Sequence, residues 1–311
     1  MNYSLHFVEA LLTFFQLAKD AVGGGNAFRV MKLEYCRPFG RNRSFDNLTS
    51  IVVTFFTALL LPLGAQAAIV TKSISYEQNG TALQGYLAYD DRATPDHKVP
   101  GILVFHEWWG LDDYIKGRAR QLAELGYVAF AADMYGGGQV TTDRKVAGEL
   151  AGKLYGKPLL AQRAQSGLDQ LLKTGLVDEK EVVSIGFCFG GAASLALVYS
   201  GAPLAGVATF HGGLIPVPSG FGEKTHAKFL ILHGALDPLV PKKAVDDFIS
   251  SANNEKLDYQ LILYSGAVHA FSNPDADKAR VAGLNGVGYN AEAAKHSWDQ
   301  LNVFLKEVFG A

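Results

Sequence analysis

Residues 181–199 decide the fold, and they read Glu-Val-Val-Ser-Ile-Gly-Phe-Cys-Phe-Gly-Gly-Ala-Ala-Ser-Leu-Ala-Leu-Val-Tyr. The apolar run at 181–187 predicts a buried strand, and the small, apolar residues at 192–199 predict a helix. Gly186 and Gly190 flank Cys188, and they remove side chains that would collide where a strand turns sharply into a helix. The stretch therefore predicts a strand–turn–helix that projects Cys188 from the carboxyl end of a sheet.

Short apolar runs and longer helical patterns alternate on both sides of this motif, as is typical of a mostly parallel sheet. An opening strand pair is expected at 74–78 and 83–89, joined by a tight turn at Asn79-Gly80. Asp112 caps an expected helix at 112–125. Further strands are expected at residues 101–106, 128–132, 206–210, 229–233 and 260–264, and helical segments at 144–173, 242–252 and 291–308. We predict the α/β class, with a mostly parallel twisted sheet covered by helices on both faces.

The composition favours a globular protein with a small-molecule partner. The chain has 311 residues, of which 49% are hydrophobic and 19% charged, so a sizeable core is expected. A net charge of -2 and a pI near 6.4 give no basic surface for a polyanion, which disfavours nucleic acid as a partner. We expect one catalytic domain over residues 68–311.

The N-terminal region is typical of a secretory signal peptide. An apolar run at 51–63 follows Arg41 and Arg43 and precedes Ala65-Gln66-Ala67, a sequence that suits a signal peptidase. The run is shorter than the roughly 20 residues that a membrane-spanning helix needs. We predict that residues 1–67 are an N-terminal extension and signal peptide, cleaved after Ala67. The alternative is an uncleaved membrane anchor formed around residues 52–61.

A signal peptide normally begins close to the start codon, and here it begins far from Met1. Met31, followed by Lys32, is the more natural beginning, and we expect translation to start there. Cleavage after Ala67 predicts an exported, periplasmic protein without stable membrane association. A cytoplasmic location is the less favoured alternative.

Cysteine usage singles out one thiol. The chain contains two cysteines, and Cys36 lies in the expected presequence, so Cys188 has no partner for an intramolecular disulfide. A lone cysteine of an exported protein is either buried and inert or a free reactive thiol. The expected turn places Cys188 at a helix N-terminus, where the backbone dipoles favour a negative charge. This context favours a nucleophile.

A thiol nucleophile needs a base and a carboxylate that orients the base, and in this type of sheet they follow the nucleophile in the order acid, then histidine. Asp237 follows the expected strand at 229–233, and His269 follows the strand at 260–264. Both residues therefore lie in loops at the carboxyl edge of the sheet, where open α/β folds bind ligands. Four histidines compete with His269 but are better explained as structural or solvated residues: His211, His226, His233 and His296.

A metal site is weakly supported. His106 and Glu107 are potential ligands, and His211 could join them, but no His-Glu-x-x-His or paired-cysteine spacing is present. We expect neither a metal nor a cofactor.

The segment Phe105-His106-Glu107-Trp108-Trp109-Gly110-Leu111, the Cys188 turn and Asp133-Met134-Tyr135-Gly136-Gly137 together resemble the dienelactone hydrolase family, whose members include carboxymethylenebutenolidases. The resemblance covers about residues 70–310 and implies the α/β-hydrolase fold. It also implies a triad of Cys188, Asp237 and His269.

The same resemblance assigns further site residues. Glu107 matches the glutamate that contacts the thiol in the resting enzyme, although it could instead help to cap the helix that begins near Asp112. The backbone N–H groups of Phe189 and Trp108 match the oxyanion donors. Trp108, Trp109 and Tyr135 are expected to line the substrate pocket.

The chain departs from the family at the residues that bind the carboxylate of dienelactone. One family arginine lies shortly after the catalytic histidine, where this chain has Asn273, and asparagine cannot form a charged bidentate clamp. Arg144 and Lys145 lie in the plausible region for the other arginine. This departure disfavours dienelactone as the physiological substrate, and Asn273 is retained as a pocket residue.

Three hypotheses follow from these observations. The first is a cysteine hydrolase that cleaves small lactones or carboxylic esters through a covalent acyl-enzyme. The second is an exported, non-catalytic protein that keeps the fold and only captures a ligand. The third is redox chemistry at Cys188, which is disfavoured because the chain lacks the resolving cysteine of a Cys-x-x-Cys motif.

Overall fold

A computed structural model describes residues 68–310. The expected signal peptide, the start at Met31 and the cleavage site after Ala67 lie outside the described residues. Within the described part of the chain, no helix is long and apolar enough to cross a membrane.

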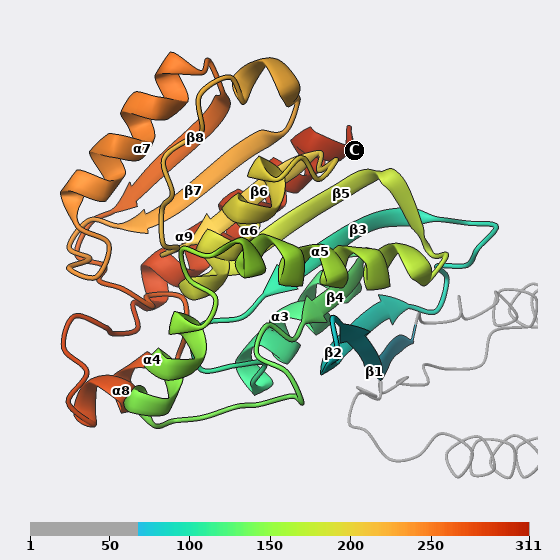
Figure 1. Cartoon of the computed structure of the whole chain (residues 1–311), viewed down its shortest axis with the longest axis horizontal. Coiled ribbons are helices and arrows are strands. Elements are labelled where there is room, and N and C mark those ends of the chain that lie inside the picture. The colour runs from blue at the N-terminus through green and yellow to red at the C-terminus, as the bar shows by residue number, and fades with distance from the viewer. Residues whose placement is uncertain (1–67, 311) are drawn as a thin grey trace, which may run out of the picture. The chain divides into compact units, whose positions relative to one another are not determined.

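The described residues form one eight-stranded sheet with the strand order β1-β2-β4-β3-β5-β6-β7-β8 (Figure 1). β1 and β2 form the expected hairpin around Asn79-Gly80, and β2 is also antiparallel to β4; all remaining neighbours are parallel. The mostly parallel α/β sheet is therefore confirmed. The strands are β1 (Ile69–Gln78), β2 (Thr81–Asp90), β3 (Val99–Phe105), β4 (Val128–Ala132), β5 (Val177–Phe187), β6 (Gly206–Phe210), β7 (Lys228–Gly234) and β8 (Asp258–Tyr264).

Helices cover both faces of the sheet, as the sequence predicts. α3 (Asp113–Glu124) and α9 (Ala291–Phe309) share one apolar core, and α5 (Pro158–Lys173) and α6 (Phe189–Tyr199) pack in the other, in front of the sheet in Figure 1. Ile102 and Val104 of β3 enter the first core, whereas Leu103 and Phe105 enter the second. This alternation, on a strand buried on both faces, explains its continuous apolar sequence.

The helical pattern at 144–173 forms two helices, α4 (Arg144–Gly152) and α5, rather than one. Gly156 has a positive φ of 70° in the connection, and Pro158 occupies the first turn of α5, where a missing N–H costs nothing. Both residues are signals of a helix boundary in the sequence. α8 (Ala276–Val281) was not expected at all; the remaining helical elements are α7 (Lys242–Asn254) and the short 3-10 helix η1 (Gly222–Lys224).

The carboxyl ends of the parallel strands point toward the side of the molecule where α4 and α8 lie (Figure 1). Arg144, at the start of α4, donates a hydrogen bond of 2.8 Å to the carbonyl oxygen of Gly283, just after α8. The loops after β3, β5, β7 and β8 all emerge at this edge of the sheet, so residues far apart in the sequence meet there.

Candidate active site

Cys188 lies in the sharp turn between β5 and α6, as predicted. It has φ 52° and ψ −113°, a region that residues with a side chain rarely adopt, and its N–H donates to the Phe210 carbonyl oxygen at 3.1 Å. A Cβ atom on Gly186 would lie 2.0 Å from the Gly190 carbonyl oxygen, and one on Gly190 would lie 2.4 Å from the Phe105 carbonyl oxygen. The two glycines are therefore required by backbone contacts on both sides of the turn.

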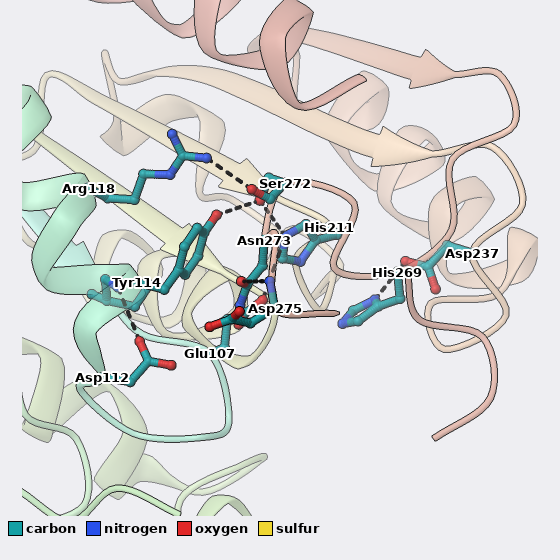
Figure 2. A network of polar contacts seen from close by, with 11 residues as sticks. Glu107, Asp112, Tyr114, Arg118, His211, Asp237, His269, Ser272, Asn273 and Asp275 are labelled. Atoms are coloured by element: carbon teal, nitrogen blue, oxygen red, sulfur yellow. Dashed lines mark hydrogen bonds and ion pairs between the residues drawn. The ribbon is translucent and has the colours of Figure 1, made fainter. Parts of the chain in front are cut away.

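Asp237 lies in the loop after β7 and is held by that loop's own backbone. Its Oδ1 atom accepts hydrogen bonds from the N–H groups of Leu239 at 2.8 Å and Val240 at 3.1 Å. Its Oδ2 atom accepts a hydrogen bond from Nδ1 of His269 at 2.7 Å, as Figure 2 shows. The carboxylate is buried, and these three hydrogen bonds from protein atoms fix its orientation.

His269 is only 5% exposed and lies in the loop after β8. Its Nε2 atom makes no hydrogen bond within ordinary distance and angle limits among the described residues, yet Cys188 is close enough for its charge to act on the ring. Burial opposes the imidazolium, but the negative charges of Cys188 and Asp237 outweigh burial and raise the pKa of His269 to about 10. At neutral pH the His269 ring is therefore held mainly as the imidazolium.

Glu107 follows β3 and is 2% exposed. Its Oε2 atom accepts a hydrogen bond of 2.6 Å from the Asn273 amide, and its Oε1 atom lies 3.9 Å from Nε2 of His211 (Figure 2). Burial and the charge of Asp112 raise the pKa of Glu107 to about 7, although the Asn273 bond opposes this. No hydrogen bond joins Glu107 to Cys188 among the described residues. The cap of α3 is formed by Asp112, which accepts from the Ile115 N–H at 3.1 Å.

A buried polar network lies behind Glu107 (Figure 2). Nε2 of His211 is 2.8 Å from the Ser272 hydroxyl, which is also 2.8 Å from the Tyr114 hydroxyl. Arg118 donates to the Ser272 carbonyl oxygen at 3.0 Å. Burial, together with the nearby His269, lowers the pKa of His211, so this histidine stays neutral. Sequence reasoning assigned His211 a structural role and did not identify the network.

The predicted oxyanion donors lie on two segments in direct contact. Phe189 is the first residue of α6, where a backbone N–H has no acceptor within its own helix. Trp108 lies in the loop after β3, and its carbonyl oxygen accepts a hydrogen bond of 2.9 Å from the Tyr135 hydroxyl. Tyr135 therefore supports the Trp108 backbone, and its ring lies 5.6 Å from that of Phe189.

The remaining pocket candidates differ in their surroundings. Trp108 and Trp109 are half-buried, with ring centroids 4.8 Å apart. Asn273 is only 4% exposed, and its amide donates to Glu107 while its Oδ1 atom accepts from the Asp275 N–H at 2.9 Å. Its hydrogen-bonding groups are therefore engaged with protein atoms.

Sequence reasoning missed Tyr155, which lies in the connection between α4 and α5. Burial of the phenol and the charge of Cys188 raise the pKa of Tyr155. Its hydroxyl lies close to Gly213, whose N–H donates to the Cys188 carbonyl oxygen at 3.0 Å. The ring is 48% exposed and lies 6.5 Å from that of Phe189. No local pattern marks this tyrosine, because only the tertiary fold brings the connection next to Phe189 at the start of α6.

Among the described residues, none of the competing histidines makes a hydrogen bond to Asp237. His233 is buried, and His226 and His296 are exposed. Among the described residues, no group of three His, Cys, Asp or Glu side chains could hold a metal ion. Arg144 and Lys145 are exposed at the start of α4.

Comparisons with known proteins agree with this architecture. The sequence model of the dienelactone hydrolase family matches residues 83–309. A protein of Saccharolobus solfataricus that carries the provisional name carboxymethylenebutenolidase is 28% identical over 271 residues, which cover 76% of this chain and 98% of that protein.

Solved structures give the same result. The crystal structure of a dienelactone hydrolase-like promiscuous phosphotriesterase from metagenomic libraries is 36% identical, with a TM-score of 0.73, and the match covers 78% of this chain and 99% of that one. An α/β hydrolase from a Medee basin deep-sea metagenome library shares the fold, with a TM-score of 0.56 at 16% identity and coverage of 78% and 99%. The chain therefore belongs to the dienelactone hydrolase family and is a hydrolase of small molecules with the α/β-hydrolase fold.

Proposed function

We propose that the chain is a cysteine hydrolase that cleaves small lactones or carboxylic esters through a triad of Cys188, His269 and Asp237. One observation carries the proposal. His269 makes a hydrogen bond of 2.7 Å to Asp237 and is close to Cys188, which is held at a positive φ in the turn after β5. The free thiol, the raised pKa of His269 and family membership support it.

In the first step the Cys188 thiolate attacks the carbonyl carbon of the ester and forms a C–S bond. The carbonyl oxygen becomes an oxyanion, which the N–H groups of Phe189 and Trp108 stabilise. When the oxyanion collapses, the C–O bond to the leaving alcohol breaks and the His269 imidazolium donates its proton to that alcohol. In a lactone the alcohol stays attached, so the ring opens.

In the second step a water molecule attacks the thioester, and neutral His269 accepts its proton. Collapse of the second oxyanion breaks the C–S bond and releases the carboxylic acid, while Cys188 returns as the thiolate. Asp237 holds Nδ1 of His269 throughout, so Nε2 faces the reacting atoms in both steps.

Glu107 is proposed to control the charge of the thiol. A carboxylate close to a thiolate disfavours the second negative charge, whereas a neutral carboxyl group does not. The pKa of Glu107, raised to about 7 mainly by burial, puts this change of charge near neutral pH. The bond from Asn273 holds the carboxyl group on the side of the loop after β8.

We further propose that the protein is exported, with residues 68–311 as the mature catalytic domain. The apolar run at 51–63 and the small residues before Ala68 support this proposal. Mass spectrometry of the periplasmic fraction should find a mature N-terminus at Ala68, and an intact N-terminus upstream of residue 51 would contradict cleavage.

The test of the catalytic proposal is hydrolysis of a panel of substrates by the purified protein. The panel contains short-chain p-nitrophenyl esters, a small neutral lactone, dienelactone and a phosphotriester, which is included because of the related phosphotriesterase. We expect hydrolysis of the neutral esters or lactone, and weaker hydrolysis of dienelactone because Asn273 carries no charge to bind its carboxylate.

Cys188→Ser and Cys188→Ala are expected to lose this activity, and Ser219→Ala, a substitution of the same size at an exposed residue outside the site, is the control. Mass spectrometry of the rapidly quenched protein should find the acyl group on Cys188. Wild-type rates in Cys188→Ala, or a wild-type protein inert toward the whole panel, would refute the proposal.

A further inference from the structure

His106 lies outside the proposed triad and is fully buried beside the loop that carries Trp108. Its Nδ1 atom donates a hydrogen bond to the Glu107 carbonyl oxygen at 2.5 Å, and its Nε2 atom accepts one from the Met134 N–H at 3.2 Å. A carbonyl requires a donor and an N–H requires an acceptor, so these contacts fix the neutral tautomer with its proton on Nδ1. Burial lowers the pKa of His106 and keeps the ring neutral.

The carbonyl group that His106 holds belongs to the same peptide unit as the Trp108 N–H. A trans peptide is planar, with its C=O and N–H on opposite sides, so a fixed carbonyl also fixes the direction of the N–H. The next peptide unit is held as well, because the Tyr135 hydroxyl donates to the Trp108 carbonyl oxygen at 2.9 Å. Buried side chains therefore hold both peptide units of Trp108, and the Gly110 N–H adds a longer hydrogen bond of 3.3 Å to the Glu107 carbonyl oxygen.

His106 also contacts the segment that carries the second oxyanion donor, the Phe189 N–H. The rings of His106 and Phe189 stack with centroids 5.9 Å apart, and the Tyr135 ring meets His106 edge-on at 4.7 Å. A Cβ atom on Gly190 would lie 2.8 Å from the His106 carbonyl oxygen, so the two donor-bearing segments are in backbone contact. One histidine thus connects both sides of the proposed oxyanion hole.

We infer that His106 is a positioning residue of the oxyanion hole: its hydrogen bond to the Glu107 carbonyl aims the Trp108 N–H at the oxyanion. The inference rests on the proposed cysteine mechanism and deepens it. A hydrogen bond to the carbonyl also polarises the N–H of the same peptide unit. Loss of one oxyanion donor typically costs about 10²- to 10³-fold in kcat, so its misalignment should cost somewhat less.

Two substitutions separate the two hydrogen bonds of His106. In His106→Asn the amide nitrogen lies near the place of Nδ1 and can still donate to the Glu107 carbonyl. In His106→Gln the amide lies near the place of Nε2, where its oxygen can accept from the Met134 N–H, and the bond to Glu107 is lost. We expect acylation by p-nitrophenyl acetate to slow about 10- to 100-fold in His106→Gln and to stay within about threefold of wild type in His106→Asn.

Alkylation of Cys188 by iodoacetamide is the control, because the thiolate displaces iodide from a saturated carbon and no oxyanion forms. Both variants should alkylate within about twofold of the wild-type rate if His106 acts through the oxyanion. A merely structural role would change alkylation and acylation together in His106→Gln, and that outcome would overturn the inference. Equal losses of acylation in the two variants would also overturn it.

Cys188→Ala distinguishes failure of the inference from failure of the mechanism. If Cys188→Ala is inactive and the His106 variants do not differ, only the role of His106 is lost. If Cys188→Ala releases p-nitrophenol at the wild-type rate, the cysteine mechanism fails, and the assignment of His106 fails with it.

Discussion

Glu107→Gln should stabilise the protein at alkaline pH and leave its stability unchanged in acid. Glu107 is 2% exposed, and its Oε1 atom has no hydrogen bond among the described residues. Burial, reinforced by the charge of Asp112, raises its pKa from 4.5 to about 7. Between these two values the folded protein holds a proton that the unfolded chain has released, so stability is lost as the pH rises.

This loss begins near pH 4.5 and is complete above about pH 7. The pKa of Glu107 differs between the folded and unfolded chain by the interval from 4.5 to about 7. This difference lowers the free energy of unfolding by about 3 kcal/mol, since one pKa unit corresponds to about 1.4 kcal/mol. Glutamine keeps an oxygen that can accept the Asn273 hydrogen bond and never ionises. The variant should therefore exceed wild type by up to about 3 kcal/mol at pH 8 and match it near pH 4.5.

Urea denaturation at a series of pH values measures this difference directly. Glu124→Gln is the matched control, because Glu124 is exposed on α3, and its substitution should change the free energy of unfolding by less than about 0.5 kcal/mol. A difference between Glu107→Gln and wild type that is the same at pH 4.5 and pH 8 would refute the reasoning, because it would show that the charge of Glu107 is not the cause.

Three further predictions concern the site and its turn. Asp237→Asn should lower kcat roughly 10²- to 10⁴-fold, because the His269 ring loses the group that orients it. The fall of kcat at high pH should also move below pH 10, because Asp237 helps to raise the pKa of His269 to about 10. A pH–rate profile measures both changes. Gly186→Ala should cost about 3 kcal/mol or more in thermal unfolding, since its Cβ would lie 2.0 Å from a backbone oxygen, whereas Gly148→Ala, with no atom within 4 Å, should not destabilise. Tyr155→Ala should raise KM several-fold and change kcat much less when a series of esters is assayed. KM values equal to those of the wild type for every ester would exclude contact between Tyr155 and the substrate.

Much of the fold could be predicted because its signals are local. Gly186 and Gly190 beside Cys188, the cap Asp112 and the Asn79-Gly80 turn each act within a few residues. The structure contains all of them where the sequence places them. The division between α4 and α5 was also encoded locally, by Gly156 and Pro158, and the long periodic pattern concealed it.

The sequence by itself determined the order of Cys188, Asp237 and His269 and the strand that each one follows. Parallel strands end at one edge of a sheet, so chain order was enough to bring these three residues together. The match to the dienelactone hydrolase family then identified the chain as a hydrolase.

Only the tertiary structure decided how these residues are surrounded. The Asn273 bond to Glu107 spans 166 residues, and the His106 bond to Met134 spans 28. Such contacts depend on the directions of side chains in loops from different strands, and no periodicity in the chain records those directions. The pKa of Glu107 depends on the same packing, because water is excluded from its carboxyl group only once the loops after β3 and β8 have met.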